Sequence, residues 1–494
     1  MKKKKTLTVG WKISALNAGI ASIRYRALYP LLALQKMGIS SKLIVSNRAK
    51  HLHGIDVLII VKSFTVDDLL VAQAAADKNI PIIIDLCDNI YVDEYKAKGG
   101  LSPASVVHQI AYYARAIVTP TEALADVVRC RLKNNIAVYV VPDGIETRQL
   151  LKRAAVAINR AQIDETNRNL ANIIHSLLRV CHLVKLLRKY SLRQTAHFLA
   201  SYRYKKASRL RTRISTRYRA LTYAFRSKRP ANQGSSNSYK QFEQPYAAQE
   251  ARRLLWFGNH GAKHKGHFGM INLVDIQAPL EQIAREFRVE LVVVSNNIAK
   301  YNELIAPLAI SSSYVEWSTD NLQKELARAE IVIVPNSCDA FSICKSANRT
   351  TLALKAGRPV VADLTPALIP LVDCIETENF YTGIRKYLKD PELVSKHIEI
   401  ANERCEQLYG QEAIASSWCS VLNAVTSKDQ PQQALEPELI IVANLVSDLE
   451  LIYSITGAAE KCRVTTEIWA STSMIRKWPY TPVSYTHLTL PTIL

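Results

Sequence analysis

The sequence contains no apolar run that approaches the roughly 18–20 residues of a membrane-spanning helix, so we expect no transmembrane segment. Its start, MKKKKTLTVGWKISALNAGIA, has the basic beginning of a signal peptide. Lys12 and Asn17 interrupt the apolar part, however, and no clear cleavage site follows. We therefore interpret the start as a lysine cluster before a first β-strand, and we expect the protein in the cytoplasm.

The nine cysteines include no C-x-x-C pair, so the sequence supports neither a zinc site nor a disulfide framework. We expect reduced thiols that are mostly buried. The rest of the composition, with 48% apolar and 22% charged residues, is ordinary for a globular protein. A chain of 494 residues is long enough for two to four domains.

Acidic residues are scarce in one segment. Residues 148–229 contain 21 lysines and arginines but only two acids, Asp164 and Glu165. Nearly all of the formal net charge of +21 therefore lies there, and the remainder of the chain is close to neutral. The position of this charge says more about partners than the overall charge does.

Residues 1–147 alternate short apolar runs with helical stretches, which is the pattern of a parallel sheet with crossover helices. Continuous Val, Ile and Leu predict strands that are buried on both faces. Residues 22–39 have the apolar spacing of an α-helix that stops at Gly38. The expected strands are TLTVGW, SKLIVS, DVLIIV, IPIIIDL, AIVTP and VYVVP.

Residues 148–250 are expected to form a basic helical insert and a linker. Up to about residue 192, basic residues alternate with apolar ones at helical spacing, and a denser basic run with interleaved tyrosines follows. Three interpretations stay open: a helix on anionic lipid or against a partner helix, a grip on nucleic acid, or a solvated helical hairpin. The apolar periodicity of 150–192 favours the first over nucleic acid.

A second α/β unit is expected at residues 251–425, with strands RLLWFGN, VELVVVS, EIVIVP and RPVVAD. After a polar linker at 426–437, residues 438–482 read as strand, helix and strand, the opening of a further Rossmann-like unit. The expected fold class is therefore α/β. It comprises two doubly wound Rossmann-like domains, a basic helical insert between them, and the start of a third α/β unit.

The end of the chain, residues 483–494, has an unusual sequence. VSYTHLTLPT resembles a translated transposase adapter that recurs at the ends of metagenomic protein predictions. We expect this tail to be non-native and the chain to be the N-terminal part of a longer protein. The alternative is a natural but truncated strand.

The segment SICKSANRTTLALKAGRPVVADL, residues 342–364, combines two features. LALKAG predicts a helix that stops at Gly357, and RPVVAD predicts a buried strand after it. Lys345, Ser346, Asn348 and Arg349 fall where the helix begins. Because anions bind at helix N-termini, the segment predicts a phosphate site.

Two Rossmann-like domains joined by a linker resemble the GT-B architecture of nucleotide-sugar glycosyltransferases. LKAGRPVVA is similar to the A-x-G-x-P-V-V motif that ends the donor-site helix of family 4 enzymes. ARAIVTPTEALADVV with VYVVPDGIE resembles the end of the acceptor domain, and LLWFGNHGAKHKGHFGMINLV resembles the start of the donor domain. The resemblance covers roughly residues 5–147 and 251–425 and implies retention of configuration at the transferred sugar.

The family's paired glutamates, spaced E-x7-E, would fall on Cys344 and Leu352, which cannot bond a sugar or ribose hydroxyl. The resemblance implies donor-binding roles for nearby residues. Lys345 or Arg349 would neutralise the diphosphate, Asn348 would pair with a hydroxyl, and Ser346 lies among them. Asp339 would replace the missing sugar-side carboxylate as a catalytic residue. The alternative for Lys345 and Arg349 is a solvated pair.

The loop GNHGAKHKGH, residues 258–267, follows a strand and is rich in Gly, His and Lys. In the resembling family a basic residue of this loop meets the donor phosphates. The resemblance implies Gly258, Lys263 and Lys265 as donor-binding residues, with Lys265 the better match, whereas the alternative is a plain surface loop. No carboxylate or cysteine is spaced with the histidines, so we expect no metal. Fixed cations can meet the charge of a leaving diphosphate.

Two parts of the N-terminal domain complete the expected site: the loop after the first strand, and Asp88. Gly19, Ser22 and Arg24 lie between the first strand and its helix, at the sheet edge where open α/β folds bind ligands. They resemble the glycine-containing loop that faces the donor across the GT-B cleft, although Arg24 and Arg26 also fit ordinary surface charges. Asp88 would orient or deprotonate an acceptor hydroxyl as a catalytic residue. Asp85, at the end of the strand before Asp88, fits this role and the cap of the next helix equally well.

The function expected from these features is that of a glycosyltransferase of the hexosyltransferase type. It would move a sugar from a nucleotide-diphosphate-sugar donor to a glycan or lipid-linked acceptor, without a metal or another cofactor. It would be cytoplasmic, with contact to the inner face of the membrane through 148–229. The alternatives are a catalytically silent transferase-like binding domain and a nucleic-acid-binding protein that acts through the basic insert.

Overall fold

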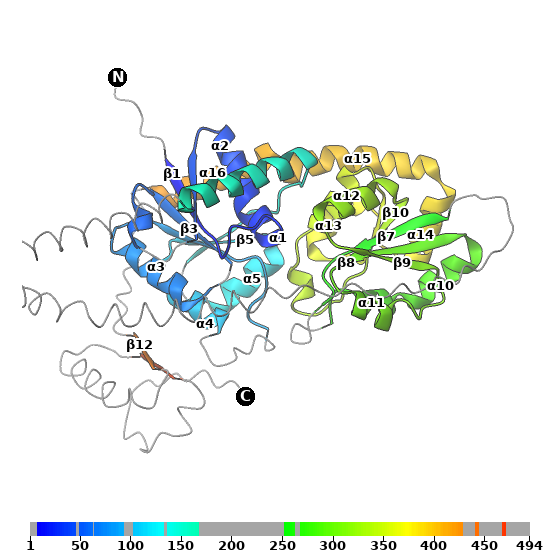
Figure 1. The fold of residues 1–494 in the computed structure, drawn as a ribbon, viewed down its shortest axis with the longest axis horizontal. Coiled ribbons are helices and arrows are strands. Elements are labelled where there is room, and N and C mark those ends of the chain that lie inside the picture. The colour runs from blue at the N-terminus through cyan, green and yellow to red at the C-terminus, as the bar shows by residue number, and fades with distance from the viewer. Residues whose placement is uncertain are drawn as a thin grey trace, which may run out of the picture. The chain divides into compact units, whose positions relative to one another are not determined.

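The structure is a computed structural model that describes residues 7–45, 49–62, 64–92, 102–132, 136–166, 251–261, 267–427, 440–443 and 467–470 (Figure 1). It divides into two compact units, Met1–Asn159 with Ala251–Leu494 and, separately, Arg160–Glu250. Most of the expected insert, from 167 to 250, and the expected tail at 483–494 lie outside the described residues. Within the described ranges, no helix is long and apolar enough to cross a membrane.

Six parallel strands form the N-terminal sheet, in the order β2-β1-β3-β4-β5-β6. Each strand corresponds to an apolar run that predicted it. Every residue of β3 and β4 is buried, so the continuous apolar pattern correctly indicated a sheet that is covered on both faces. The bounds are β1 Thr8–Lys12, β2 Ser40–Ile44, β3 Val57–Val61, β4 Ile82–Asp85, β5 Ala116–Thr119 and β6 Ala137–Val140.

The helices of the N-terminal domain begin at polar capping residues. Thr65 and Asp68 form a capping box, and Ser102 and Thr121 cap the two helices that follow. The helix expected at 22–39 is confirmed, with a π-helical part, and Gly38 follows it at φ +79°. The bounds are α1 Ala21–Ile23, η1 Arg24–Leu28, α2 Tyr29–Lys36, η2 Ala49–Leu52, α3 Val66–Ala76, α4 Pro103–Ala111 and α5 Glu122–Arg131.

The second sheet has five parallel strands in the order β11-β10-β7-β8-β9. Four of them were predicted. β9 was not, because its sequence SSYVE contains no apolar run and it lies at the sheet edge, where its residues are only partly buried. The bounds are β7 Arg252–Phe257, β8 Val289–Ser295, β9 Ser312–Glu316, β10 Ile331–Val334 and β11 Val360–Ala362.

The helices of this second domain include the one predicted before Gly357. That helix is α13, and Gly357 follows it with φ +72° before β11, as the sequence indicated. The bounds are α9 Asn272–Asp275, α10 Gln277–Glu286, α11 Ile298–Leu304, α12 Thr319–Arg328, η3 Ser342–Cys344, α13 Asn348–Lys355, η4 Pro366–Cys374, α14 Phe380–Lys389, α15 Pro391–Tyr409 and α16 Gln411–Thr426.

Each large sheet carries one hydrophobic cluster on each face. On the N-terminal sheet, α2 and α16 cover the face of Trp11, and α3, α4 and α5 cover the face of Ile84. On the second sheet, α12, α13 and α15 cover the face of Val292, and α10, α11 and α14 cover the face of Val293. Helices on both faces of two parallel sheets confirm the doubly wound α/β class.

A third, two-stranded sheet lies in the segment that was expected to open a further unit. Its strands, β12 Ile440–Ala443 and β13 Glu467–Ala470, pair in parallel. A parallel pair requires a crossover connection, and the residues between the two strands lie outside the described ranges.

Two segments pack differently from the expected domain boundaries. Residues 148–166 are helical, and Leu150, Ala154 and Ile158 join the N-terminal core. The apolar face of this helix is therefore buried against the N-terminal core, and residues up to Asn159 belong to the first compact unit. Likewise α16, expected in the 251–425 domain, packs in the N-terminal core, where Trp418 meets Trp11 at a ring-centroid distance of 5.1 Å. Periodicity shows which side of a helix is buried, but not which sheet buries it.

Replacing Trp418 by Ala should lower the free energy of unfolding by about 3–5 kcal/mol, because it removes a fully buried indole and its edge contact with Trp11. Urea denaturation measures the change. Ser416→Ala, at an exposed position of the same helix, serves as the control and should stay within about 0.5 kcal/mol of the parent protein. Equal stability of the two variants would contradict the packing of α16 on the N-terminal core.

Candidate functional site

The strand orders locate the ligand-binding edges of both sheets. In open α/β sheets, ligands bind beyond the carboxyl ends of the strands, where the strand order reverses. The second sheet reverses between β7 and β10, and the N-terminal sheet reverses between β1 and β3. Gly258 follows β7, and the segment 336–349 follows β10. Of the residues predicted for the donor site, those that the structure describes therefore lie at this edge: Gly258, Lys345, Ser346, Asn348 and Arg349.

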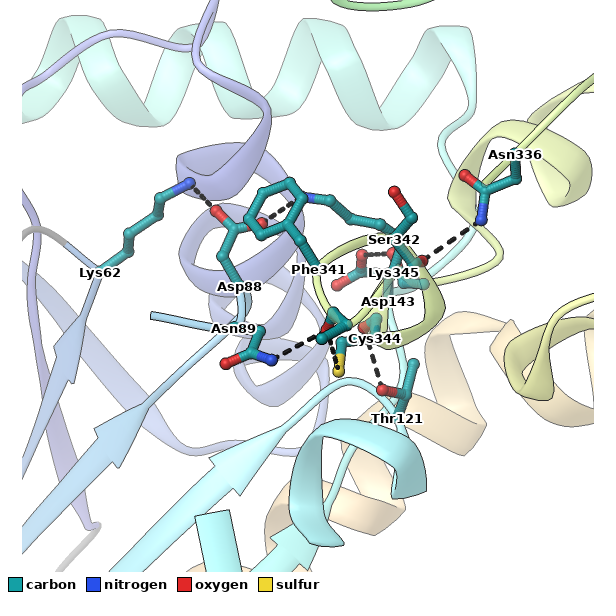
Figure 2. Close-up of polar contacts among 12 residues, drawn as sticks. Lys62, Asp88, Asn89, Thr121, Asp143, Asn336, Phe341, Ser342, Cys344 and Lys345 are labelled. Carbon is teal, nitrogen blue, oxygen red and sulfur yellow. Dashed lines mark hydrogen bonds and ion pairs between the residues drawn. The ribbon is translucent and has the colours of Figure 1, made fainter. Parts of the chain in front are cut away.

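Lys345 contacts a carboxylate of the N-terminal sheet. Its Nζ pairs with Asp88 Oδ1, and Lys62 Nζ pairs with Asp88 Oδ2 (Figure 2). The Lys345 ammonium also lies 3.9 Å from the ring centroid of Phe341, at cation–π distance. The structure thus brings together Lys345 and Asp88, two predicted site residues that are 257 positions apart in the chain.

Asp88 is buried, with 7% of its surface exposed. Burial alone would raise the pKa of its carboxyl, but the ammonium groups of Lys345 and Lys62 outweigh burial and hold that pKa well below its usual range. A carboxylate with so low a pKa is a weak base, and both of its oxygens are already bonded. The geometry therefore disfavours the predicted deprotonation of an acceptor hydroxyl by Asp88. Its orienting role stays a prediction.

Ser346 is held by a second carboxylate from the N-terminal sheet. Its Oγ donates to Asp143 Oδ2 at 2.6 Å, and Asp143 Oδ1 accepts from Arg26 Nη1 at 3.0 Å. Arg26 also pairs with Asp85 at 2.8 Å. All three charged groups are buried, so Asp85 is an ion-pair partner rather than a helix cap. Sequence reasoning missed Asp143, although its position in the loop after the predicted strand VYVVP was a usable signal.

Further contacts hold the backbone of residues 340–344. Asn89 Nδ2 donates to Ala340 O at 2.9 Å, and Thr121 Oγ1 donates to Cys344 O at 3.1 Å (Figure 2). Asn89 follows β4 and Thr121 follows β5, so the carboxyl edge of the N-terminal sheet fixes this loop through several strands. The start of α13 is placed by this loop.

Asn348 and Arg349 differ from Lys345 and Ser346 in their bonding. Among the residues that the structure describes, no hydrogen bond or ion pair engages the Arg349 guanidinium, and burial alone lowers the pKa of Arg349 to about 10. It is therefore charged at neutral pH. Within the same ranges, Asn348 is bonded only through its backbone carbonyl.

The first turn of α13 is also uncapped. Ala347 precedes it without a side-chain cap, and the turn contains no acidic residue. The first N–H groups of a helix have no partner in the helix and carry its positive end. A Cβ built on Gly258 would lie 3.1 Å from the Trp256 ring and 3.5 Å from Arg349 Nη1, so this glycine lies directly beside the guanidinium. Gly258, Arg349 and the start of α13 together are suited to an anion.

Asp339 holds the turn that precedes α13. Its Oδ1 accepts from the N–H groups of Phe341 and Ser342 at 2.8 and 3.0 Å, and its Oδ2 accepts from Ser337 Oγ at 2.6 Å. Burial would raise the pKa of Asp339, but these hydrogen bonds outweigh it and lower the pKa. The carboxylate has a clear role in organising η3. Its predicted role in catalysis stays a prediction.

The N-terminal loop contains a second buried ion pair. Arg24 Nε donates to Glu146 Oε2 at 2.7 Å, and Arg24 Nη1 donates to the carbonyls of Ala18 and Gly19 at 2.8 and 3.0 Å. Arg24 and Arg26 are only 4% and 1% exposed, so their interpretation as surface charges is wrong. Gly19 is exposed and Ser22 is half-buried. The Arg24 guanidinium lies 5.8 Å from the ring centroid of Trp317, which follows β9.

The loop after β7 is described only at its two ends. Lys263 and Lys265 lie outside the described residues, so their predicted role is not tested. At the base of the loop, a Cβ on Gly269, which has φ +92°, would come within 2.5 Å of Asn259 O, so only glycine fits there. In the described part of the chain, no three His, Cys, Asp or Glu side chains are grouped to hold a metal ion.

The positions of the family's paired glutamates lie in the protein core. Cys344 is 1% exposed and packs with the N-terminal sheet, and Leu352 is 5% exposed and packs with the second sheet. Both side chains lie in hydrophobic clusters, where a buried ionised carboxylate is costly. The departure seen in the sequence is therefore built into the packing.

No family model and no curated protein matches the sequence. Among solved structures, the chain is similar to HepE from Anabaena in complex with UDP, with 11% identity and a TM-score of 0.49 over 85% of this chain and 100% of that one. A glycosyltransferase from Rickettsia africae follows with 11% identity and a TM-score of 0.48, over 86% and 100%. UDP-GlcNAc 2-epimerase from Neisseria meningitidis, bound to UDP-GlcNAc, has 13% identity and a TM-score of 0.40, over 84% and 100%. The assignment of the fold rests on the strand orders of the two parallel sheets.

Replacing Asp88 by Asn should destabilise the protein more near pH 6 than near pH 3. The pKa of Asp88 is lower in the folded protein than the value of about 3.9 in an unfolded chain. Its ionised form therefore stabilises the fold fully above that value, and this contribution is lost as the pH falls below it. Urea denaturation at both pH values measures the difference. The exposed Asp77→Asn change is the control, and a loss that is equal at both pH values would contradict the assignment.

Proposed function

We propose that the protein is a glycosyltransferase that uses a nucleotide-diphosphate sugar as its donor. The observation that supports this most directly is the charged Arg349, which is unpaired among the described residues, in the first turn of α13 at the edge where the strand order of the second sheet reverses. A half-buried guanidinium without an acidic partner is costly unless an anion completes its bonding. The A-x-G-x-P-V-V resemblance at the end of the same helix supports a donor diphosphate as that anion.

In this proposal the diphosphate binds at the start of α13. Arg349 and the free N–H groups of the first turn meet the negative charge that develops on the leaving nucleotide, and Asn348 bonds a donor hydroxyl. Gly258 permits close approach of the phosphates, since it has no Cβ beside Arg349. Lys263 and Lys265 would add charge from the loop after β7. These cations give the leaving group its stabilisation without a metal.

The acceptor in this proposal is a glycan or a lipid-linked glycan, and the basic residues within 148–229 bring the enzyme to an anionic membrane face. Leu150, Ala154 and Ile158 of that segment pack on the N-terminal core, so in this proposal the basic residues that follow them make the membrane contact. The resemblance to family 4 implies retention of configuration. The anomer of the product, assigned by proton NMR, tests that point.

A catalytically silent nucleotide-sugar-binding protein is the second candidate. It is favoured by Cys344 and Leu352, which are buried where the family carries glutamates. Incubation with radiolabelled UDP-, GDP- and ADP-sugars and a glycan panel separates the two candidates. Transfer or hydrolysis of any donor supports the enzyme, whereas tight binding without turnover supports the silent protein.

Replacing Arg349 by Met should weaken the binding of nucleoside diphosphates about 10- to 100-fold, because hydrogen bonds between charged groups contribute about 1.5–3 kcal/mol. Calorimetry with UDP, GDP and ADP measures the affinities. Lys355→Met, at the opposite end of α13, is the matched control and should bind as the parent protein does. Unchanged affinity in Arg349→Met would show that the phosphates bind elsewhere.

A further inference from the structure

Asp88 has two cationic partners of different origin. Lys62 and Asp88 follow the neighbouring strands β3 and β4 of the same sheet, whereas Lys345 comes from the loop before α13. Each ammonium takes one carboxylate oxygen, Lys62 on Oδ2 and Lys345 on Oδ1 (Figure 2). The Asp88 side chain is 9% exposed, while those of Lys62 and Lys345 are 38% and 34% exposed. One buried anion is thus shared by two accessible cations.

This sharing makes one of the two cations exchangeable. Removing the only partner of a buried charge is strongly unfavourable, because the remaining charge is left unpaired. Asp88 can lose Lys345 without that penalty, since Lys62 still neutralises it. Lys62 is also firmly placed. Its N–H donates to Asp85 O at 3.3 Å, and its φ of +23° is a conformation that persists only where the surroundings hold it.

We propose that Lys345 leaves Asp88 for the diphosphate of a bound nucleotide, while Lys62 stays on Asp88 and keeps the carboxylate paired. Lys62 is then a positioning residue that controls donor affinity without touching the donor. Asp88 acts as an internal competitor that holds Lys345 when the site is empty. The inference rests on the proposed function and adds to it the way in which the site is regulated.

The geometry around α13 supports such an exchange. Lys345 lies three positions before the first residue of α13 and four positions before Arg349, so both cations serve the same helix start. Ser346, directly after Lys345, donates a hydrogen bond to Asp143. This bond keeps the backbone in place when the Lys345 side chain moves. The movement therefore needs only a change of side-chain conformation at an accessible lysine.

A double-mutant cycle tests the proposal. Calorimetry with UDP, GDP and ADP compares the parent protein with Lys62→Met, Asp88→Asn and the double variant. We expect Lys62→Met to bind about tenfold more weakly. Without the Lys62 ammonium, movement of Lys345 to the diphosphate would leave the buried Asp88 carboxylate unpaired. Asp88→Asn should bind at least as tightly as the parent. The double variant should match Asp88→Asn, because in the proposal Lys62 affects donor binding only through that carboxylate.

Two other outcomes would overturn the proposal. Equal losses from Lys62→Met with and without Asp88 would show that Lys62 contacts the ligand directly. No change in any variant would show that the three residues form a static structural group. Lys62→Arg, which keeps the cation, should retain the parent affinity. A loss of affinity in Lys62→Met but not in Lys62→Arg would be due to the missing charge. Thermal unfolding of each variant shows whether the substitution also destabilises the fold.

The outcomes also distinguish this inference from the proposed function. If the parent protein binds none of the three nucleotides, the proposed function fails. If it binds them through Arg349 but the cycle is additive, only the exchange of Lys345 fails. As a second measurement, Lys345→Met should weaken binding more in the Asp88→Asn protein than in the parent, since there Lys345 is released from competition.

Discussion

The buried guanidinium of Arg26 connects the framework of the N-terminal sheet to the start of α13. It binds Asp85 at the end of β4, and it binds the Val141 carbonyl and Asp143 beyond β6. The second oxygen of Asp143 then accepts from Ser346. A planar guanidinium with five donors can bond all of these groups at once, which a lysine ammonium cannot do in this geometry. Because buried charges are costly when unpaired, the network is complete or it is not formed. The position of the loop before α13 is fixed by this network, because Ser346 is bonded to Asp143.

The parts of the fold that follow from local composition were predictable. Runs of Val and Ile in IPIIIDL and EIVIVP specify buried parallel strands, and LALKAG with Gly357 specifies the end of α13. The parts that depend on distant partners were not. The edge strand β9 has no apolar run, and nothing in the sequence of α16 indicates that it packs against Trp11. Arg24 and Arg26 looked equally suited to the surface, because their partners Glu146 and Asp143 are more than 100 positions away.

The candidate site shows the same limit in chemical form. The sequence KSANR places two cations and two polar side chains at one helix start, so all four were predicted to bind the donor. The fold divides them into pairs. Lys345 and Ser346 are bonded to carboxylates of the N-terminal sheet, whereas Asn348 and Arg349 face no such partner among the described residues. Counting cations in a motif overestimates its free positive charge when acids from another part of the chain reach it. The motif alone does not reveal this neutralisation, because Asp88 and Asp143 are more than 200 positions away from Lys345 and Ser346 in the sequence.

The packing of α16 has a consequence for synthesis on the ribosome. Trp418 covers the face of the N-terminal sheet that contains Trp11, and about 400 residues separate the two indoles. At roughly 5–20 residues per second, the part of that face that α16 covers stays open for about 20–80 seconds after Trp11 has been made, although α2 can already pack on the rest. The N-terminal sheet therefore cannot finish folding while it is the only part of the chain that has emerged. Its completion waits for the whole second domain, which links the maturation of the two halves in time as well as in space.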